Sequence, residues 1–204
     1  MFGIDSKFYE VVSKIADLVV LNLLFVLFSL PIITMGASTT ALYGVTKKMA
    51  ENREGYIFRN FFQLFKENFR QSTVMWIILL VAAMIPTVDL YIINSLEKTV
   101  ITTALKGLML VTALTVLLVF LYAMALQSTF ENTIKNTLKN AFLMGIGYFP
   151  WTLLILLITL LPIILIVLLG KTAGSVVYVM LFVGFAVLAY LNSYIFNHIF
   201  KKYM

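Results

Sequence analysis

Ionisable and amide side chains occur inside apolar stretches of this sequence, where they could pair with one another or line a polar path. Asp89 lies in the apolar stretch Val74–Ile93, and Lys106 lies at a similar depth at the start of the next one. Charged groups inside a bilayer are costly unless they are paired, so we expect an ion pair between Asp89 and Lys106. Asp17 and Asn22, in the first apolar stretch, could join them in lining an outward-opening polar cavity.

A second chemical possibility lies in the small and hydroxylated residues after Pro31, namely Gly36, Ser38, Thr39 and Thr40. If a helix begins at Ser38 or Thr39, its N-terminal amides and hydroxyls could hold an anion, as a ligand seat. Alternatively, Gly36 ends the preceding helix, and the small residues let a short helix through Ala41–Met49 pack closely on a neighbour.

The sequence lacks the residues and motifs that most catalytic sites and metal sites require. The chain contains no cysteine and one histidine, His198. It has no Gly-rich phosphate loop, no HExxH motif and no serine elbow. We therefore expect no catalytic residue, no metal ligand and no cofactor, and we expect the protein not to be an enzyme.

The composition predicts an integral membrane protein. Of 204 residues, 62% are hydrophobic and 12% are charged, with a mean hydropathy of +1.01. Soluble domains carry about 25% charged residues. A chain of this length predicts a single transmembrane domain over residues 1–204. Five stretches are long enough to cross a bilayer as helices: Leu18–Met35, Val74–Ile93, Gly107–Leu126, Tyr148–Gly170 and Val176–Phe196. The predicted fold is an all-α bundle of five transmembrane helices.

Two segments between these stretches have the pattern of amphipathic helices. In Tyr56–Gln71, one predicted face carries Phe58, Phe61, Phe62, Phe65 and Phe69, and Arg59, Gln63, Lys66 and Arg70 fill the other. In Phe130–Phe142, Lys135 and Lys139 lie opposite an apolar face. We expect both helices at the cytoplasmic surface of the membrane, with these polar residues as candidates for docking a partner.

The distribution of Lys and Arg predicts the orientation, since cytoplasmic segments are enriched in both. With five spans, ten of the 15 basic residues share one side: Lys47, Lys48, Arg53, Arg59, Lys66, Arg70, Lys135, Lys139, Lys201 and Lys202. The other five are Lys7, Lys14, Lys98, Lys106 and Lys171. We therefore expect the N-terminus outside and the C-terminus in the cytoplasm. The net charge of +6 then reflects this bias, and we expect no nucleic-acid partner.

Two runs of the sequence carry a family resemblance. "NLLFVLFSLPIITMGASTTALYGVTKKM" followed by "GYIFRNFFQLFKENFRQSTVMWIILL" resembles the YesL family of small bacterial membrane proteins of unknown function. The most specific positions are Ser29-Leu30-Pro31, Thr34, the run Gly36 to Ala41, and Glu54-Gly55. The resemblance implies a multi-pass protein of the bacterial cell membrane with an accessory role beside carbohydrate importers of the ABC class.

The leading functional hypothesis is a non-enzymatic membrane subunit of a bacterial carbohydrate ABC import system. Its expected partners are the lipid bilayer and the permease and ATPase subunits, and a homo-oligomer stays open. The alternatives are an independent small-solute transporter or channel, and a membrane scaffold or sensor that reads the bilayer through its basic helices.

Overall fold

The computed structural model describes residues 3–53 and 55–203, with side chains described from Phe8 onward. Every regular element in these ranges is helical. The α-helices are α1 (Gly3–Ser29), α2 (Met35–Ala50), α3 (Ile57–Asn94), α4 (Val100–Gln127), α5 (Ile134–Gly147), α6 (Phe149–Leu169), α7 (Gly174–Val179) and α8 (Phe185–Phe200). The shorter turns are η1 (Ile32–Thr34), η2 (Gly170–Thr172) and the π-helical η3 (Met180–Gly184).

Five helical segments are long and apolar enough to cross a membrane: Phe8–Ser29, Ile57–Asn94, Val100–Gln127, Phe149–Thr172 and Gly174–Phe200. The predicted all-α class and the five long apolar helices are confirmed. Their outward faces carry many exposed large hydrophobic side chains, which a bilayer would cover.

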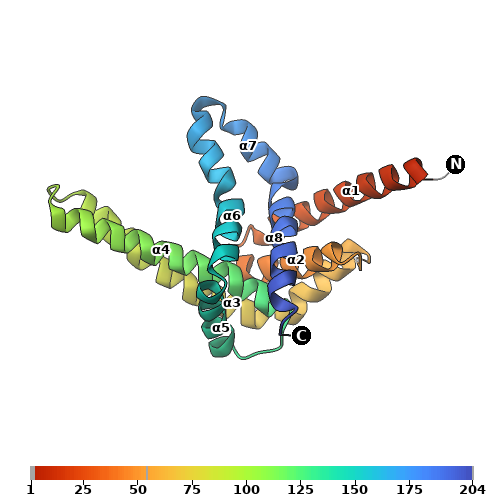
Figure 1. Cartoon of the computed structure of the whole chain (residues 1–204), viewed down its shortest axis with the longest axis horizontal. Coiled ribbons are helices and arrows are strands. Elements are labelled where there is room, and N and C mark those ends of the chain that lie inside the picture. Colours follow the sequence, from red (N-terminus) through yellow and green to blue (C-terminus); the bar gives the residue numbers. More distant parts are fainter. Residues whose placement is uncertain (1–2, 54, 204) are drawn as a thin grey trace.

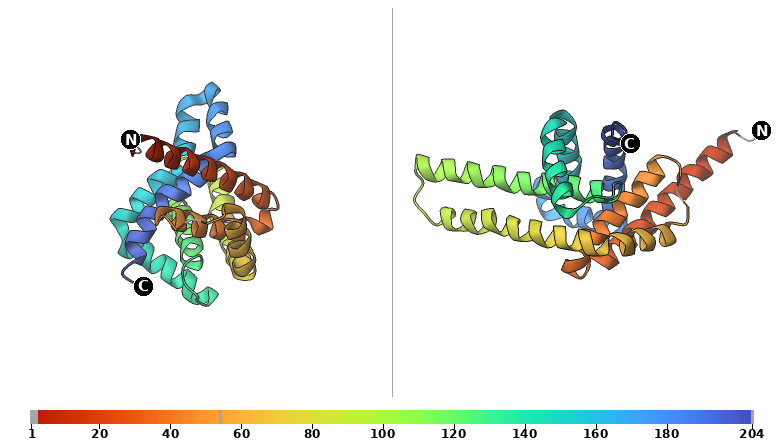
Figure 2. Two further views of the ribbon diagram at one scale, coloured as in Figure 1. Left: turned by 90° about the vertical axis from the view of Figure 1, so that its right-hand side faces the viewer. Right: turned by 90° about the horizontal axis from the view of Figure 1, so that it is seen from below.

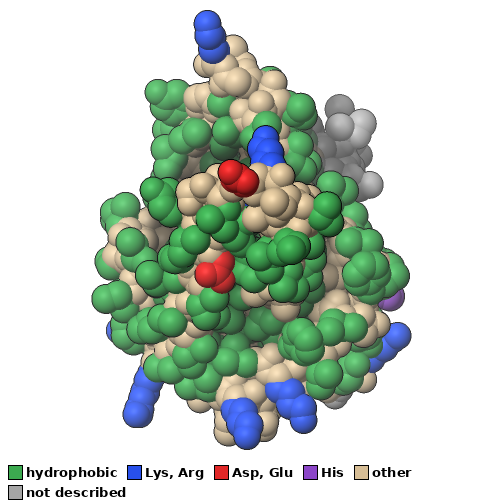
Figure 3. All heavy atoms as spheres, turned by 90° about the vertical axis from the view of Figure 1, so that its left-hand side faces the viewer, with side chains coloured by type: hydrophobic (Ala, Val, Ile, Leu, Met, Phe, Trp, Pro, Cys, Tyr) green, Lys and Arg blue, Asp and Glu red, His purple; other side chains and the backbone are tan. Residues whose placement is uncertain are grey.

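The long helices splay apart instead of forming one parallel bundle. The antiparallel pair α3 and α4 projects to the left in Figure 1, α6 and α7 project upward, and α1 projects to the right. A second view confirms that α1 and the α3–α4 pair extend in opposite directions (Figure 2). The face toward which the α3–α4 pair projects is largely hydrophobic, with Lys and Arg side chains along its lower edge (Figure 3).

The short helix α2 is the most enclosed element, although it is not one of the five long apolar helices. Every residue from Gly36 to Thr46 is buried. A Cβ atom added to Gly36 would lie 2.5 Å from the Ser72 carbonyl oxygen and 2.5 Å from Trp76 Cβ. The hydroxyls of Thr40 and Ser72 lie 2.9 Å apart, so small residues allow α2 and α3 to touch and to share a hydrogen bond.

The break before α2 differs from the prediction at Gly36. Helix α1 ends at Ser29, ahead of Pro31, because the residue before a proline is disfavoured in the helical conformation. Helix α2 begins at Met35, so Gly36 does not end a helix, and Ser38 and Thr39 do not cap one. The Thr34 hydroxyl instead donates to the carbonyl oxygen of Pro31 at 2.8 Å and to that of Phe28, in the last turn of α1.

The segment predicted as a separate amphipathic helix is the first half of α3, which continues unbroken for 38 residues. Part of its phenylalanine stripe packs on α1. The ring of Phe28 lies 5.9, 4.9 and 5.2 Å, centroid to centroid, from the rings of Phe61, Phe62 and Phe65. Phe58 and Phe69 are exposed.

Replacing Gly36 by Ala is expected to lower the free energy of unfolding by about 1–3 kcal/mol, because the new methyl group overpacks the α2–α3 contact. Denaturant unfolding of the purified protein in detergent measures this. The matched control is Gly107→Ala in α4, where an added Cβ would meet nothing within 4 Å. Equal stability of the two variants would contradict the close approach of α2 to α3.

Candidate functional site

The predicted ion pair between Asp89 and Lys106 is wrong. Among the described residues, the salt bridges join Glu10 to Lys14 at 3.3 Å and Glu51 to Arg53. Asp89 and Lys106 are each half-buried on α3 and α4. Their positions predict matching depths along two helices, but depth does not determine the face from which each side chain leaves its helix.

Asn22 is fully buried and connects α1 to the C-terminal helices. Its amide nitrogen donates to the carbonyl oxygens of Met180 and Leu181, at 3.1 and 2.7 Å, and its oxygen accepts from the Ala186 amide at 3.0 Å. Met180 and Leu181 lie in the π-helical turn η3, where the regular α-helical pairing is interrupted, and Ala186 follows it. Asn22 is therefore committed to holding this turn and does not line a polar cavity.

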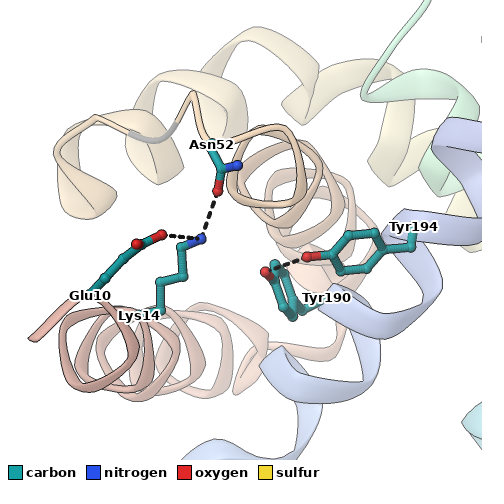
Figure 4. Close-up of polar contacts among 5 residues, drawn as sticks. All are labelled: Glu10, Lys14, Asn52, Tyr190 and Tyr194. Atoms are coloured by element: carbon teal, nitrogen blue, oxygen red, sulfur yellow. Dashed lines mark hydrogen bonds and ion pairs between the residues drawn. The ribbon is translucent and has the colours of Figure 1, made fainter. Parts of the chain in front are cut away.

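The first half of α1 lies against the segment that follows α2. The Lys14 ammonium donates to the side-chain oxygen of Asn52 at 2.6 Å and also pairs with Glu10 (Figure 4). Asp17 borders a hollow together with residues 55–58. A bilayer cannot separate Lys14 from Asn52 while this contact exists. The prediction of an N-terminus outside and Asn52 inside is incompatible with it.

Figure 4 also shows a tyrosine pair on α8 beside these groups. The hydroxyls of Tyr190 and Tyr194 lie 2.6 Å apart. The start of α1, the segment after α2 and the face of α8 thus come together at one end of the fold.

The residues considered for a ligand seat are enclosed by protein. Gly36, Ser38, Thr39 and Thr40 are all buried inside α2. Thr39 donates to the Met35 carbonyl oxygen at 2.7 Å, and Thr40 bonds with Ser72. This geometry fits the packing alternative, because the Thr39 and Thr40 hydroxyls bond to protein groups and Gly36 lies directly against α3. The Ser38 hydroxyl is buried without a partner among the described residues.

The candidate docking residues are all exposed. Arg59, Gln63, Lys66 and Arg70 lie along one side of α3, and Lys135 and Lys139 lie on α5. We call Arg59, Lys66 and Arg70 the basic ridge. The spacing of these residues, three to four apart or a multiple of it, gives them a common helix face.

Beside this ridge lies a polar cavity of about 860 Å³, which we call the amide pocket. It is formed by α3, the end of α4, the segment that joins α4 to α5, and the first turn of α5. The lining residues are Leu64, Glu67, Asn68, Gln71, Gln127, Ser128, Thr129, Phe130, Glu131, Asn132, Thr133 and Asn136.

Hydrogen bonds position the floor of the amide pocket. The Gln127 amide nitrogen donates to the side-chain oxygens of Asn68 and Gln71, at 3.0 and 2.8 Å. The Asn68 amide in turn donates to the Leu64 carbonyl oxygen at 2.9 Å. Gln127 is 8% exposed, and its side-chain oxygen has no hydrogen-bond partner among the described residues. Such an oxygen can accept a donor from a ligand.

The wall of the pocket is also fixed at both of its helix ends. The Ser128 hydroxyl donates to the Ala125 carbonyl oxygen at 2.8 Å, which closes the last turn of α4. The Thr133 side chain accepts from the Asn136 amide and caps α5. The intervening segment is therefore held between two capped helices.

Charge in the pocket differs from charge around it. Glu67 and Glu131 line the pocket, and none of its described lining residues is basic. Lys47 does not line the pocket, but its ammonium donates to the hydroxyl of the lining residue Thr129 at 3.2 Å. Burial, together with the positive charge of Arg53, lowers the pKa of Lys47 to about 8. The pocket is thus acidic within a basic surface.

Reasoning from the sequence did not identify the amide pocket. Asn68 and Gln71 are polar residues three apart on α3, and that spacing was an available signal. Gln127 is 56 residues beyond Gln71, and no local pattern indicates that the two side chains meet.

Two comparisons with known proteins bear on the identity of the chain. Residues 18–90 match the family model described as "Protein of unknown function, DUF624". The chain is 29% identical over 116 residues to the uncharacterized protein YesL of Bacillus subtilis (strain 168), and the match covers 56% of each protein. The chain thus spans little more than half of the length of this relative. No solved structure matches it.

Replacing Asn22 by Leu is expected to lower the free energy of unfolding by about 1–2 kcal/mol, because three backbone groups at the π-helical turn lose their partner in an apolar setting. Denaturant unfolding in detergent measures the loss. Asn94→Leu, at the exposed end of α3, is the control and should change stability little. An unchanged Asn22→Leu variant would show that the turn does not depend on this side chain.

Proposed function

We propose a function on the premise that the chain belongs to the YesL family, as both matches support. The protein is a non-enzymatic, integral membrane accessory subunit that docks a partner protein at the amide pocket and the basic ridge. The observation that carries this proposal is a large polar cavity beside exposed cations, in a chain whose surface is otherwise largely apolar. Such a cavity has no role in packing against lipid.

The partner we propose is a bacterial carbohydrate ABC import system, through its permease or ATPase subunits. The resemblance to the YesL family supports this choice. The first half of α3 and helix α5 supply the docking surface, and both belong to the segments predicted as amphipathic cytoplasmic helices. The protein then lies in the bacterial cell membrane with the basic ridge, the amide pocket and its C-terminus in the cytoplasm.

For the N-terminal region we propose a cytoplasmic location as well, with α1 and α2 forming a hairpin that enters the membrane and returns. The segment from Lys14 to Ser29 has 16 residues, and α2 has 16 residues. Each spans roughly 24 Å at 1.5 Å per residue. The bilayer core is about 30 Å thick, so neither arm crosses it from the level of Asn52.

The chemistry of the bend supports this hairpin. No charged residue occurs from Leu18 through Thr46, and the exposed side chains at the bend, Leu30, Ile32 and Ile33, are apolar. The Trp76 indole nitrogen donates to the Ile32 carbonyl oxygen at 2.7 Å, and Thr34 serves the carbonyls of Phe28 and Pro31. A chain break at membrane depth requires such internal partners.

The positive-inside rule supports it further. With the hairpin, Lys7 and Lys14 join the cytoplasmic group. Of the 15 Lys and Arg residues, only Lys98, Lys106 and Lys171 then lie outside, which is a stronger bias than five crossings would give. The remaining long helices, α3, α4, α6 and the α7–α8 unit, cross the membrane.

Single cysteines can test this topology, since the natural chain has none. In intact cells, Ser95→Cys and Thr172→Cys are expected to react with a membrane-impermeant maleimide. Ser6→Cys and Asn52→Cys should react only after the cells are permeabilised. Labelling of Ser6→Cys in intact cells, with Asn52→Cys protected, would overturn the hairpin.

Partner docking can be tested by reversing charge on the ridge. The triple variant Arg59→Glu, Lys66→Glu and Arg70→Glu is expected to lose most of the permease and ATPase subunits that copurify with the wild type in mild detergent. Mass spectrometry against an isotope-labelled wild-type sample measures the loss. The control reverses the exposed Lys98 and Lys171 and should retain the partners. If the triple variant keeps every partner and loses only its preference for anionic lipid, the protein is a membrane sensor instead.

A further inference from the structure

The lining of the amide pocket carries acidic side chains and, among the described residues, no basic one. Glu67 and Glu131 contribute two carboxylates, and the described salt bridges involve neither of them. Glu67 accepts one hydrogen bond, from the Gln63 amide at 2.9 Å. Ionised carboxylates accept at several positions each and donate none. The pocket therefore favours a molecule that brings donors.

Gln127 points to the same requirement independently of the carboxylates. Both donating interactions of its amide nitrogen are already made within the protein, to Asn68 and Gln71. Its oxygen remains, in a side chain that is more than nine-tenths buried, with no partner among the described residues. An unpaired buried acceptor lowers stability, so a donor that reaches this oxygen recovers part of that free energy.

We infer that the amide pocket receives a cationic side chain, Arg or Lys, from the tip of the partner's docking segment. The inference rests on the proposed docking function and names the chemistry of its central contact. An Arg guanidinium has five donors in a planar fork, which suits carboxylates and a side-chain carbonyl together. Phe130 and Leu64 offer an aromatic face and an aliphatic surface for its stem.

The basic ridge adds a second requirement on the partner. Arg59, Lys66 and Arg70 lie exposed on the same helix that supplies Glu67 to the pocket. A docking segment must therefore carry its cation flanked by acidic residues, so that each charge meets the opposite one. This alternation fixes the register of the complex and rejects segments of uniform charge.

Binding of a small cation to the purified full chain in detergent tests the contact without any partner. Agmatine, a four-carbon chain with a guanidinium at one end and an ammonium at the other, is the probe. It is expected to raise Tm in a saturable manner. The double variant Glu67→Gln and Glu131→Gln, which preserves shape, should weaken this binding at least about tenfold. Glu97→Gln, in the exposed segment between α3 and α4, is the matched control and should bind like the wild type.

Two further probes make the result decisive at equal ionic strength. Magnesium chloride tests for a metal site, and methyl glucoside tests for a saccharide site. A saturable shift with either of these in place of agmatine overturns the inference. The absence of any agmatine shift in the wild type also overturns it, whatever the folding of the variants.

Copurification separates this inference from the proposed function. If the ridge variant loses the importer subunits and the Glu67→Gln, Glu131→Gln variant loses them too, both stand. If only the ridge variant loses them, docking stands and the cationic contact fails. If neither variant loses them, the docking function itself fails.

Discussion

Backbone amide and carbonyl groups that leave water must find partners within the protein, and the architecture depends on how this chain meets that constraint. Two interruptions of regular helix occur in apolar surroundings: the bend between α1 and α2, and the π-helical turn before α8. At the bend, the Thr34 hydroxyl donates to the Phe28 carbonyl oxygen. Thr34 and Trp76 also add a second hydrogen bond to the carbonyl oxygens of Pro31 and Ile32, each of which accepts a backbone amide as well. At the turn, Asn22 serves two carbonyls and one amide. Without these side chains, each interruption would leave polar groups facing lipid, at a cost of several kcal/mol each.

Close packing of α2 is the counterpart of this constraint. Small side chains at Gly36 and Thr40 bring the backbones of α2 and α3 into contact, so that the bend lies against Trp76. In lipid, association of helices gains little from the hydrophobic effect and depends on such contact and on hydrogen bonds between side chains. The run of small residues from Gly36 to Ala41 carries the resemblance to the YesL family. The same run therefore lets α2 pack closely inside the protein.

Much of the fold could be predicted from the sequence, because apolar length and the proline break are local properties. The five long helices were predicted, and close packing around Gly36 was one of the two alternatives that the sequence left open. The predicted ion pair between Asp89 and Lys106 was wrong, because the direction in which side chains on two helices point depends on tertiary contacts that the sequence does not show. The amide pocket was missed for a related reason: Gln127 meets Asn68 and Gln71 only once α4 has folded back along α3.

Orientation shows most clearly how one contact changes the interpretation of a sequence. Counting Lys and Arg over five crossings divides them ten to five, and Lys7 and Lys14 oppose the rule. The hydrogen bond from Lys14 to Asn52 removes that opposition, because it joins the region before Leu18 to the basic segment after α2. In the hairpin topology proposed above, four long helices cross the membrane. The basic ridge, the amide pocket and both ends of the hairpin then lie on one side, which is the arrangement that the proposed docking function requires.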